Sequence, residues 1–402
     1  MESSAPADQG LLDRVTLFVS RVMAIEDVTS GGQKDQFSFR FRGRLRSVNS
    51  AAAYDELYQA LLPLELTPLF RVDEVRHSIL ILEGVYRKKP ANPGVNLGLF
   101  ILTLLSVTLS GALFGLSEPL PEGIWPAALA LIERGWPFAV SLIAILGAHE
   151  LGHYFAGRAH GVNVTLPYFI PFPFSPFGTL GAFINMKEPP RNRRHLLDIG
   201  IAGPLAGLMV AIPVTLIGLS LSTLDIVNLE PGMGFTIEGN SVLYLLLKYL
   251  TFGQLLPQPL SYGDTPILLY WLRYFFTGTP IPMGGLDVMI HPVAWAGWAG
   301  ILVTAMNLIP AGQLDGGHMI YVLLGRKWAS RLFPVILVIL FGLGFFWNGW
   351  WLWVALIFFL GRRYAEPLDQ ITELDGKRKA LAILALIIFI LVFIPVPIIV
   401  VQ

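Results

Sequence analysis

The 402-residue sequence contains no cysteine. Disulfide bonds, thiolate metal ligands and cysteine nucleophiles are therefore excluded, and any metal site must use histidine, carboxylate, amide or water ligands. Charged residues are also scarce, since they make up 14% of the chain, against about 25% of an average soluble protein. The 28 basic and 28 acidic residues balance, so the composition gives no basic footprint for nucleic acid.

Apolar residues are correspondingly abundant. They form 54% of the chain, and the mean hydropathy is +0.62, which is typical of a protein that crosses a bilayer several times. The apolar runs predict spans over residues 95–116, 137–159, 196–221, 293–308 and 380–394, and two short spans within 333–360. Two further apolar segments, 243–252 and 267–276, are short for a crossing. The predicted fold is an all-α, multi-pass membrane bundle of about six to seven spans.

The first 90 residues differ from the rest in being rich in charge. In FSFRFRGRL, residues 37–45, aromatic and polar residues alternate, which predicts a half-buried strand. Asn49 and Ser50 are suited to cap a helix that reaches about residue 62. The same kind of periodicity predicts a helix over 10–23 and strands over 67–72 and 78–82. We therefore expect a small soluble α+β domain over 1–90, followed by a membrane domain over 91–402.

Basic residues gather at one end of the predicted spans. They lie just before the first and third spans, after the fourth, and between the last two, whereas the other loops have few. By the positive-inside rule, these basic loops and the N-terminal domain face the cytoplasm. The opening residues, MESSAPADQG, lack a basic start and an apolar core, so they do not predict a signal peptide. We expect an integral, multi-pass protein of the cell membrane.

The most informative stretch is LGAHELGHYF, residues 146–155, within the second predicted span. His149 and His153 are four residues apart, so both imidazoles lie on one face of a helix and can bind one Zn²⁺. Glu150 lies beside them, where it can take a proton from a water that the metal activates. The alternative is a set of polar residues satisfied by neighbouring helices, but ionisable groups inside a span are functional by default.

A catalytic zinc ion needs a third protein ligand. The best candidate is Asp315, in the segment MNLIPAGQLDGGH at 306–318 that ends the fourth span. Pro310 and Gly312 break the helix there, and Gly316 allows a close backbone approach. The alternative is an ordinary turn in which Asp315 caps the following helix. The histidines lie ~18–24 Å along their span, past the middle of a ~30 Å core. Asp315 ends a span that runs in the same direction, so all three ligands are expected at one depth.

Taken together, the two motifs resemble those of the site-2 protease family of intramembrane zinc metalloproteases. HELGH in one span and NLIPAGQLDGG at the end of a later one carry the resemblance, which covers a catalytic core over about 137–325. The branch resembled is the one with an N-terminal soluble domain, as in cyanobacterial and plastid proteins. The resemblance implies that His149, His153 and Asp315 bind zinc, that Glu150 is the general base, and that Asn307 lies near the active site.

The segment FGTLGAF, residues 177–183, resembles the membrane-dipping hairpin of the same family. In that interpretation Gly178, Thr179, Leu180 and Gly181 offer an open strand edge to an extended substrate. The alternative interpretation is a glycine-rich loop between two spans.

These features predict an intramembrane zinc metalloprotease that hydrolyses peptide bonds within or near transmembrane segments, as in regulated intramembrane proteolysis. The predicted cofactor is Zn²⁺, and the predicted partners are transmembrane protein substrates and the lipid bilayer, without nucleic acid. The sequence does not indicate an oligomeric state. Two other classes stay open: a zinc- or proton-coupled transporter, and an inactive homologue that binds membrane segments as a chaperone. A transporter would have polar residues along several spans, whereas here they concentrate at one depth.

Overall fold

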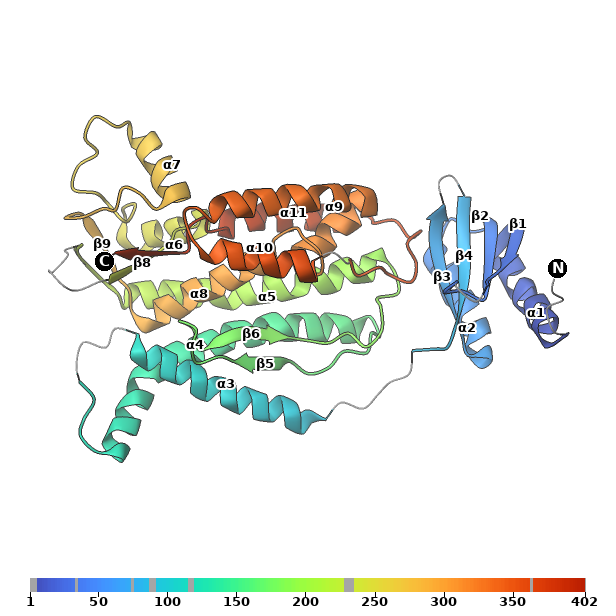
Figure 1. Ribbon diagram of the computed structural model, residues 1–402, viewed down its shortest axis with the longest axis horizontal. Coiled ribbons are helices and arrows are strands. Elements are labelled where there is room, and N and C mark those ends of the chain that lie inside the picture. The colour runs from blue at the N-terminus through green and yellow to red at the C-terminus, as the bar shows by residue number, and fades with distance from the viewer. Residues whose placement is uncertain are drawn as a thin grey trace.

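The computed structural model describes residues 6–32, 35–73, 76–86, 92–114, 119–227, 235–361 and 364–401. It is mostly helical, with a small strand-containing module at the N-terminal end. Figure 1 shows this module at one end of an elongated bundle of helices. The predicted boundary at 90/91 lies outside the described residues, as do the basic residues at 87–89 and 362–363 that contributed to the orientation argument.

The N-terminal module, defined here as residues 6–86, is a four-stranded antiparallel sheet with two helices. Its strands run in the order β1-β2-β4-β3. The elements are α1 (Pro6–Val22), β1 (Met23–Ser30), β2 (Phe39–Leu45), α2 (Ser50–Leu61), a short 3₁₀ turn (Leu62–Leu64), β3 (Leu66–Asp73) and β4 (Arg76–Glu83). Asn49 caps α2 as predicted, because its side chain accepts a hydrogen bond from the Ala52 backbone N–H at 3.3 Å. Alternating apolar residues such as Phe41 and Ile79 form the module's own buried core with the two helices.

One strand of the module was not predicted from the sequence. β1 has only its first residue fully buried, and MAIEDVTS shows no clear alternation. It is held instead by pairing with β2 along its length, including a register shift between Ile25 and Asp27. A strand stabilised by backbone pairing more than by burial leaves little trace in a hydropathy pattern.

Three of the described helices are long and apolar enough to cross a membrane. They are α3 (Pro93–Leu113), α4 (Ile124–Ala159) and α5 (Arg193–Ser220). The second predicted span, 137–159, lies within α4, which begins earlier, at Ile124, and carries Pro137 within it. The remaining helices are α6 (Val242–Phe252), α7 (Ile267–Thr277), α8 (Pro292–Asn307), α9 (Asp315–Leu343), α10 (Gly349–Leu360) and α11 (Gly376–Val392). The expected number of six to seven spans stays a prediction.

The helices of the bundle approach closely where small residues meet. A Cβ built on Gly152 of α4 would lie 2.4 Å from the Ala202 backbone oxygen of α5. A Cβ on Gly218 of α5 would lie 2.1 Å from the Ala294 nitrogen of α8. Glycine at these two crossings lets α5 pack directly between α4 and α8, and α4 and α5 are the helices on which the metal centre depends.

Short strand pairs complete the bundle. β5 (Tyr168–Pro171) and β6 (Thr179–Phe183) form a hairpin between α4 and α5. At the end far from the N-terminal module (Figure 1), β7 (Thr223–Ile226) pairs with β9 (Leu286–Met289). There β8 (Phe235–Glu238) also pairs with β10 (Ile398–Val401). The break between two apolar helices that the sequence predicted within 333–360 is confirmed, since α9 ends at Leu343 and α10 begins at Gly349.

Candidate metal centre

The HExxH residues lie on α4, well inside the bundle. His149 is 3% exposed and His153 is 8% exposed, and their ring nitrogens Nε2 are 3.2 Å apart. One helical turn separates them, as the spacing predicts. Two imidazole nitrogens that lie this close together, away from solvent, are placed to bind one cation.

α5 fixes the orientation of His153. The Nδ1–H of His153 donates to the backbone oxygen of Ile199 at 2.7 Å, so its Nε2 is the unprotonated nitrogen that faces the centre. A Cβ built on Gly203, one turn further along α5, would lie 2.1 Å from that Nε2. A glycine is therefore required at position 203 for the imidazole to occupy this place.

Asp315 reaches the same point from the start of α9. The chain leaves α8 after Asn307 and turns tightly before α9 begins. Gly316 and Gly317 permit this turn, because a Cβ on either would lie within 2.3 Å of a backbone oxygen. The alternative of Asp315 as a helix cap is not what the structure shows, since Leu314 occupies the cap position and Asp315 is the first helical residue.

The three side chains form a compact donor set. Asp315 Oδ2 lies 3.4 Å from His149 Nε2 and 3.3 Å from His153 Nε2. Ligands about 2.1 Å from a tetrahedral zinc ion are separated by about 3.4 Å. The observed separations of 3.2, 3.3 and 3.4 Å therefore match three corners of such a tetrahedron. No other group of three such side chains within ligand distance occurs among the described residues.

Glu150 lies between the ligands and the β5–β6 hairpin. Glu150 is 6% exposed, and its carboxylate lies near the backbone of Ile184, the residue after β6. One face of α4 thus carries the two histidine ligands, whereas Glu150 lies toward the end of strand β6. This contact was not predicted, because a backbone donor has no signature in the sequence.

Asn307 also reaches the centre. Its Nδ2 lies 3.3 Å from His149 Nε2, so the last residue of α8 contacts a ligand that precedes it by 158 positions. The end of α8 and the start of α9 thereby place an amide beside His149 and a carboxylate beside both histidines.

The hairpin residues are held against α3 and within their own turn. The Ser106 hydroxyl donates to the Gly178 backbone oxygen at 2.6 Å. The Thr179 hydroxyl donates to the Ile170 backbone oxygen at 2.7 Å and accepts from the Gly181 N–H at 2.9 Å. Leu180 is 64% exposed. Among the described strands, β6 pairs only with β5, which leaves its other edge open.

A cavity of about 690 Å³ adjoins the turn between Asn307 and Asp315. It contains no metal ligand and is lined by apolar side chains of α6, α7, α9 and α11 together with Ile309 and Pro310. The large cavity and the metal centre are thus different places that share one turn of the chain.

Comparisons with known proteins agree with this geometry. Residues 137–345 match the model of peptidase family M50. The Arabidopsis thaliana protein named "Probable zinc metalloprotease EGY2, chloroplastic" is 33% identical over 271 residues, which is 67% of this chain and 43% of the relative. The Arabidopsis "Probable zinc metalloprotease EGY1, chloroplastic" is 29% identical over 341 residues, 78% of this chain and 56% of the relative. The chain therefore spans about half the length of these relatives. No solved structure gives a significant match.

A buried His–His–Asp donor set with a neighbouring carboxylate, whose two histidines lie on a helix apolar enough to cross a bilayer, is the kind of metal site found in metallopeptidases. Zinc is the metal that this donor set fits. The chain belongs to peptidase family M50, the site-2 protease family, as the resemblance of its motifs implied.

Proposed function

We propose that this protein is an intramembrane zinc protease that cleaves peptide bonds in or near the transmembrane segments of other membrane proteins. The observation that carries the proposal is the placement of His149, His153 and Asp315 at tetrahedral separations, with Glu150 beside them. The names of the relatives, which describe probable zinc metalloproteases, support the same activity.

The roles follow from where each side chain points. His149, His153 and Asp315 would hold the zinc ion, which supplies Lewis-acid polarisation of the scissile carbonyl and acidifies a water. Glu150 takes the proton of that water and returns it to the leaving amine. Asn307, whose amide lies 3.3 Å from a ligand nitrogen, is positioned to donate to the substrate carbonyl oxygen.

The substrate is an apolar segment that enters the site in an extended form. A helical peptide bond is shielded by its own turn, so the segment has to unwind locally. The open edge of β6 supports strand addition, in which Gly178, Thr179, Leu180 and Gly181 align the substrate backbone beside Glu150. The apolar cavity beside Pro310 supports an approach from the lipid side.

The placement in the membrane is also part of the proposal. Residues 1–90 form a soluble domain on the cytoplasmic side of the cell membrane, and residues 91–402 form the membrane domain with its core at about 137–325. Two separate buried cores, one in the N-terminal module and one in the bundle, support the division. The positive-inside pattern supports the orientation.

The two other functional classes are less well supported. A transporter would need ionisable groups along a path, and the donor set is confined to one depth. An inactive chaperone would not need Glu150, which is intact and in contact with the hairpin.

Metal removal and replacement test the proposal. The purified chain in lipid vesicles should cleave a reporter membrane substrate, lose cleavage when a chelator removes the metal, and regain it with zinc but not magnesium. An Asp315→Ala variant should bind less zinc and stay inactive after zinc is added. Cleavage that persists without metal, or a wild-type chain that binds no zinc, would contradict the proposal.

A further inference from the structure

The loop that joins α10 to α11 ties the N-terminal module to the bundle. The Phe70 N–H donates to the Leu368 oxygen at 2.9 Å, and the Gln370 N–H donates to the Phe70 oxygen at 3.1 Å. Segment 366–372 therefore lies along β3, the edge strand of the module's sheet. The Leu368 side chain is 6% exposed and belongs to the module's own buried core. An edge strand is covered in this way by chain from the membrane domain.

The same loop is bonded to the segment that leads into α5. The Leu368 N–H donates to the Pro190 oxygen at 3.0 Å, and the Asp369 N–H donates to the Arg191 oxygen at 2.7 Å. Asp369 is fully buried, and its carboxylate accepts from Ser50, the first residue of α2, at 3.3 Å. One stretch of loop thus holds the module on one side and the start of α5 on the other.

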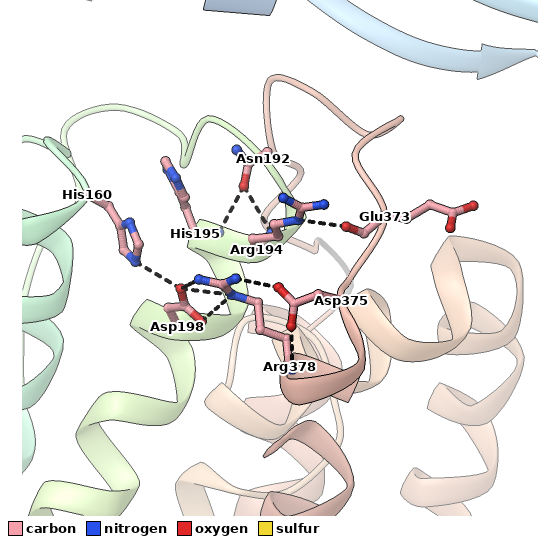
Figure 2. Close-up of polar contacts among 8 residues, drawn as sticks. All are labelled: His160, Asn192, Arg194, His195, Asp198, Glu373, Asp375 and Arg378. Atoms are coloured by element: carbon pink, nitrogen blue, oxygen red, sulfur yellow. Dashed lines mark hydrogen bonds and ion pairs between the residues drawn. The ribbon is translucent and has the colours of Figure 1, made fainter. Parts of the chain in front are cut away.

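An ion pair then anchors the second turn of α5 to α11. Arg378 donates to both carboxylate oxygens of Asp198, with its Nε 2.9 and 3.1 Å away and its Nη2 2.6 Å away. Asp375, the N-cap of α11, accepts from Arg378 Nη1 at 2.6 Å. His160, at the end of α4, lies 3.0 Å from Asp198 on the other side. Figure 2 shows His160 and Arg378 reaching Asp198 from the two sides, with Asp375 bonded to Arg378.

Asp198 is adjacent in sequence to Ile199, whose backbone oxygen accepts the His153 hydrogen bond. The ion pair therefore fixes the part of α5 that orients a metal ligand. A displacement of this turn along α5 would lengthen the 2.7 Å bond to His153 and bring Gly203, one turn further on, into a different position against the ring.

We propose that Arg378 and Asp198 are positioning residues for the metal centre, and that they transmit the docking of the N-terminal module to His153 through segment 366–372. The proposal rests on the zinc site proposed above. It gives the module a role that the sequence left open: the docked module holds α5 in the register that favours metal binding.

The test measures zinc affinity of the full chain by competition with a chromophoric chelator, separately from cleavage. Arg378→Gln should weaken zinc binding by about 10- to 100-fold, the usual cost of losing a group that orients a ligand. Arg378→Lys should give an intermediate loss, because lysine keeps the charge but not the two-pronged contact. Arg76→Gln is the matched control: it breaks an exposed ion pair with Glu26 at 3.5 Å on the module's surface and should leave zinc affinity unchanged.

Leu368→Ala tests the connection to the module. It should weaken zinc binding by undocking the loop, and combining it with Arg378→Gln should cost less than the product of the two single effects. Wild-type affinity in Arg378→Gln and Asp198→Asn would overturn the positioning role, and fully multiplicative effects would overturn the connection. A wild-type chain without zinc affinity would instead overturn the proposed function, so the two failures are distinguishable.

Discussion

At the scale of single residues, the metal centre depends on a position of α5 that has no side chain, Gly203, as well as on the ligands. Gly203 leaves the space that the His153 ring needs, since a Cβ there would lie 2.1 Å from Nε2. We predict that Gly203→Ala lowers zinc affinity at least ~10-fold, the scale seen when a group around a ligand is disturbed. Gly147→Ala, in α4, is the control, because a Cβ there meets no atom within 4 Å. Equal zinc affinity in the two variants would contradict this account.

A variant at Asn307 distinguishes a role in catalysis from a role in metal binding. If its amide donates to the substrate oxygen, Asn307→Ala should lower kcat by about 10²–10³, as for other oxyanion donors. Zinc content, measured by metal analysis of the purified variant, should match wild type. Loss of zinc with the amide would instead make Asn307 a support of His149, which it approaches to 3.3 Å.

Side chains with a local pattern could be found from the sequence, and backbone groups could not. The helical spacing of the HExxH motif predicted His149, Glu150 and His153 as site residues. The helix-breaking residues before Asp315 predicted that residue. Ile199 contacts His153 through its backbone carbonyl, and Ile184 lies near Glu150 through its backbone, so their side chains carry no signal of these contacts. Gly203 was recognisable only as a small residue suited to close helix packing.

At the scale of elements, three of the predicted spans, 95–116, 137–159 and 196–221, overlap the long apolar helices α3, α4 and α5. The predicted apolar run begins at Pro137, yet the 36-residue helix α4 begins earlier, at Ile124, and continues through this proline. The N-terminal part of α4 is held by packing on α3, where a Cβ on Gly135 would lie 2.0 Å from the Thr108 oxygen. Tertiary packing of this kind outweighs the local preference of a proline for a helix boundary.

The hairpin gives a prediction about substrate binding. Leu180→Pro removes one backbone N–H from β6, whereas Leu180→Ala removes only a side chain that is 64% exposed. If substrates add to β6 as a strand, the proline variant should cleave a reporter far more slowly than the alanine variant, mainly through a higher KM. Both variants should retain zinc. Equal KM values for the two would rule out strand addition at this residue.

At the scale of the whole molecule, a second buried cluster holds the end of the bundle far from the N-terminal module (Figure 1). Lys248 is fully buried, with its Nζ 2.8 Å from Glu238 Oε1 and 3.5 Å from Asp287 Oδ1. Two carboxylates thus share one ammonium group. Burial raises the pKa of Asp287 to about 6; Lys248 opposes this shift and Glu238 adds to it.

The sign of the pH effect follows from that shift. An aspartate with a higher pKa in the folded chain binds its proton more tightly there, so its contribution to stability is full below pH 3.8 and is lost as pH rises through about 6. Asp287→Asn should therefore raise Tm relative to wild type at pH 7.5, with a smaller gain near pH 4. Glu238→Gln should lower Tm at pH 7.5, because it removes the nearer partner of Lys248. An equal loss of Tm in both variants at pH 7.5 would contradict this.

The way in which the N-terminal module docks on the bundle was the least predictable feature from the sequence. Hydropathy distinguishes the charged N-terminal module from the apolar bundle, but the docking of the module depends on contacts such as Ser50 with Asp369, 319 residues apart. Nothing local in either residue indicates its partner. The loop at 366–372 is polar and short of periodicity, so its role in joining the two parts emerges only from the structure.

The central claim is that Glu150 performs proton transfer at a zinc centre within the membrane. The most direct measurement compares wild type with Glu150→Gln, reconstituted in the same vesicles, for cleavage of a reporter transmembrane substrate and for bound zinc. The account predicts that the variant retains zinc while cleavage falls by about 10²–10⁴, the usual contribution of a general base. Cleavage at the wild-type rate in a zinc-loaded Glu150→Gln variant would contradict it.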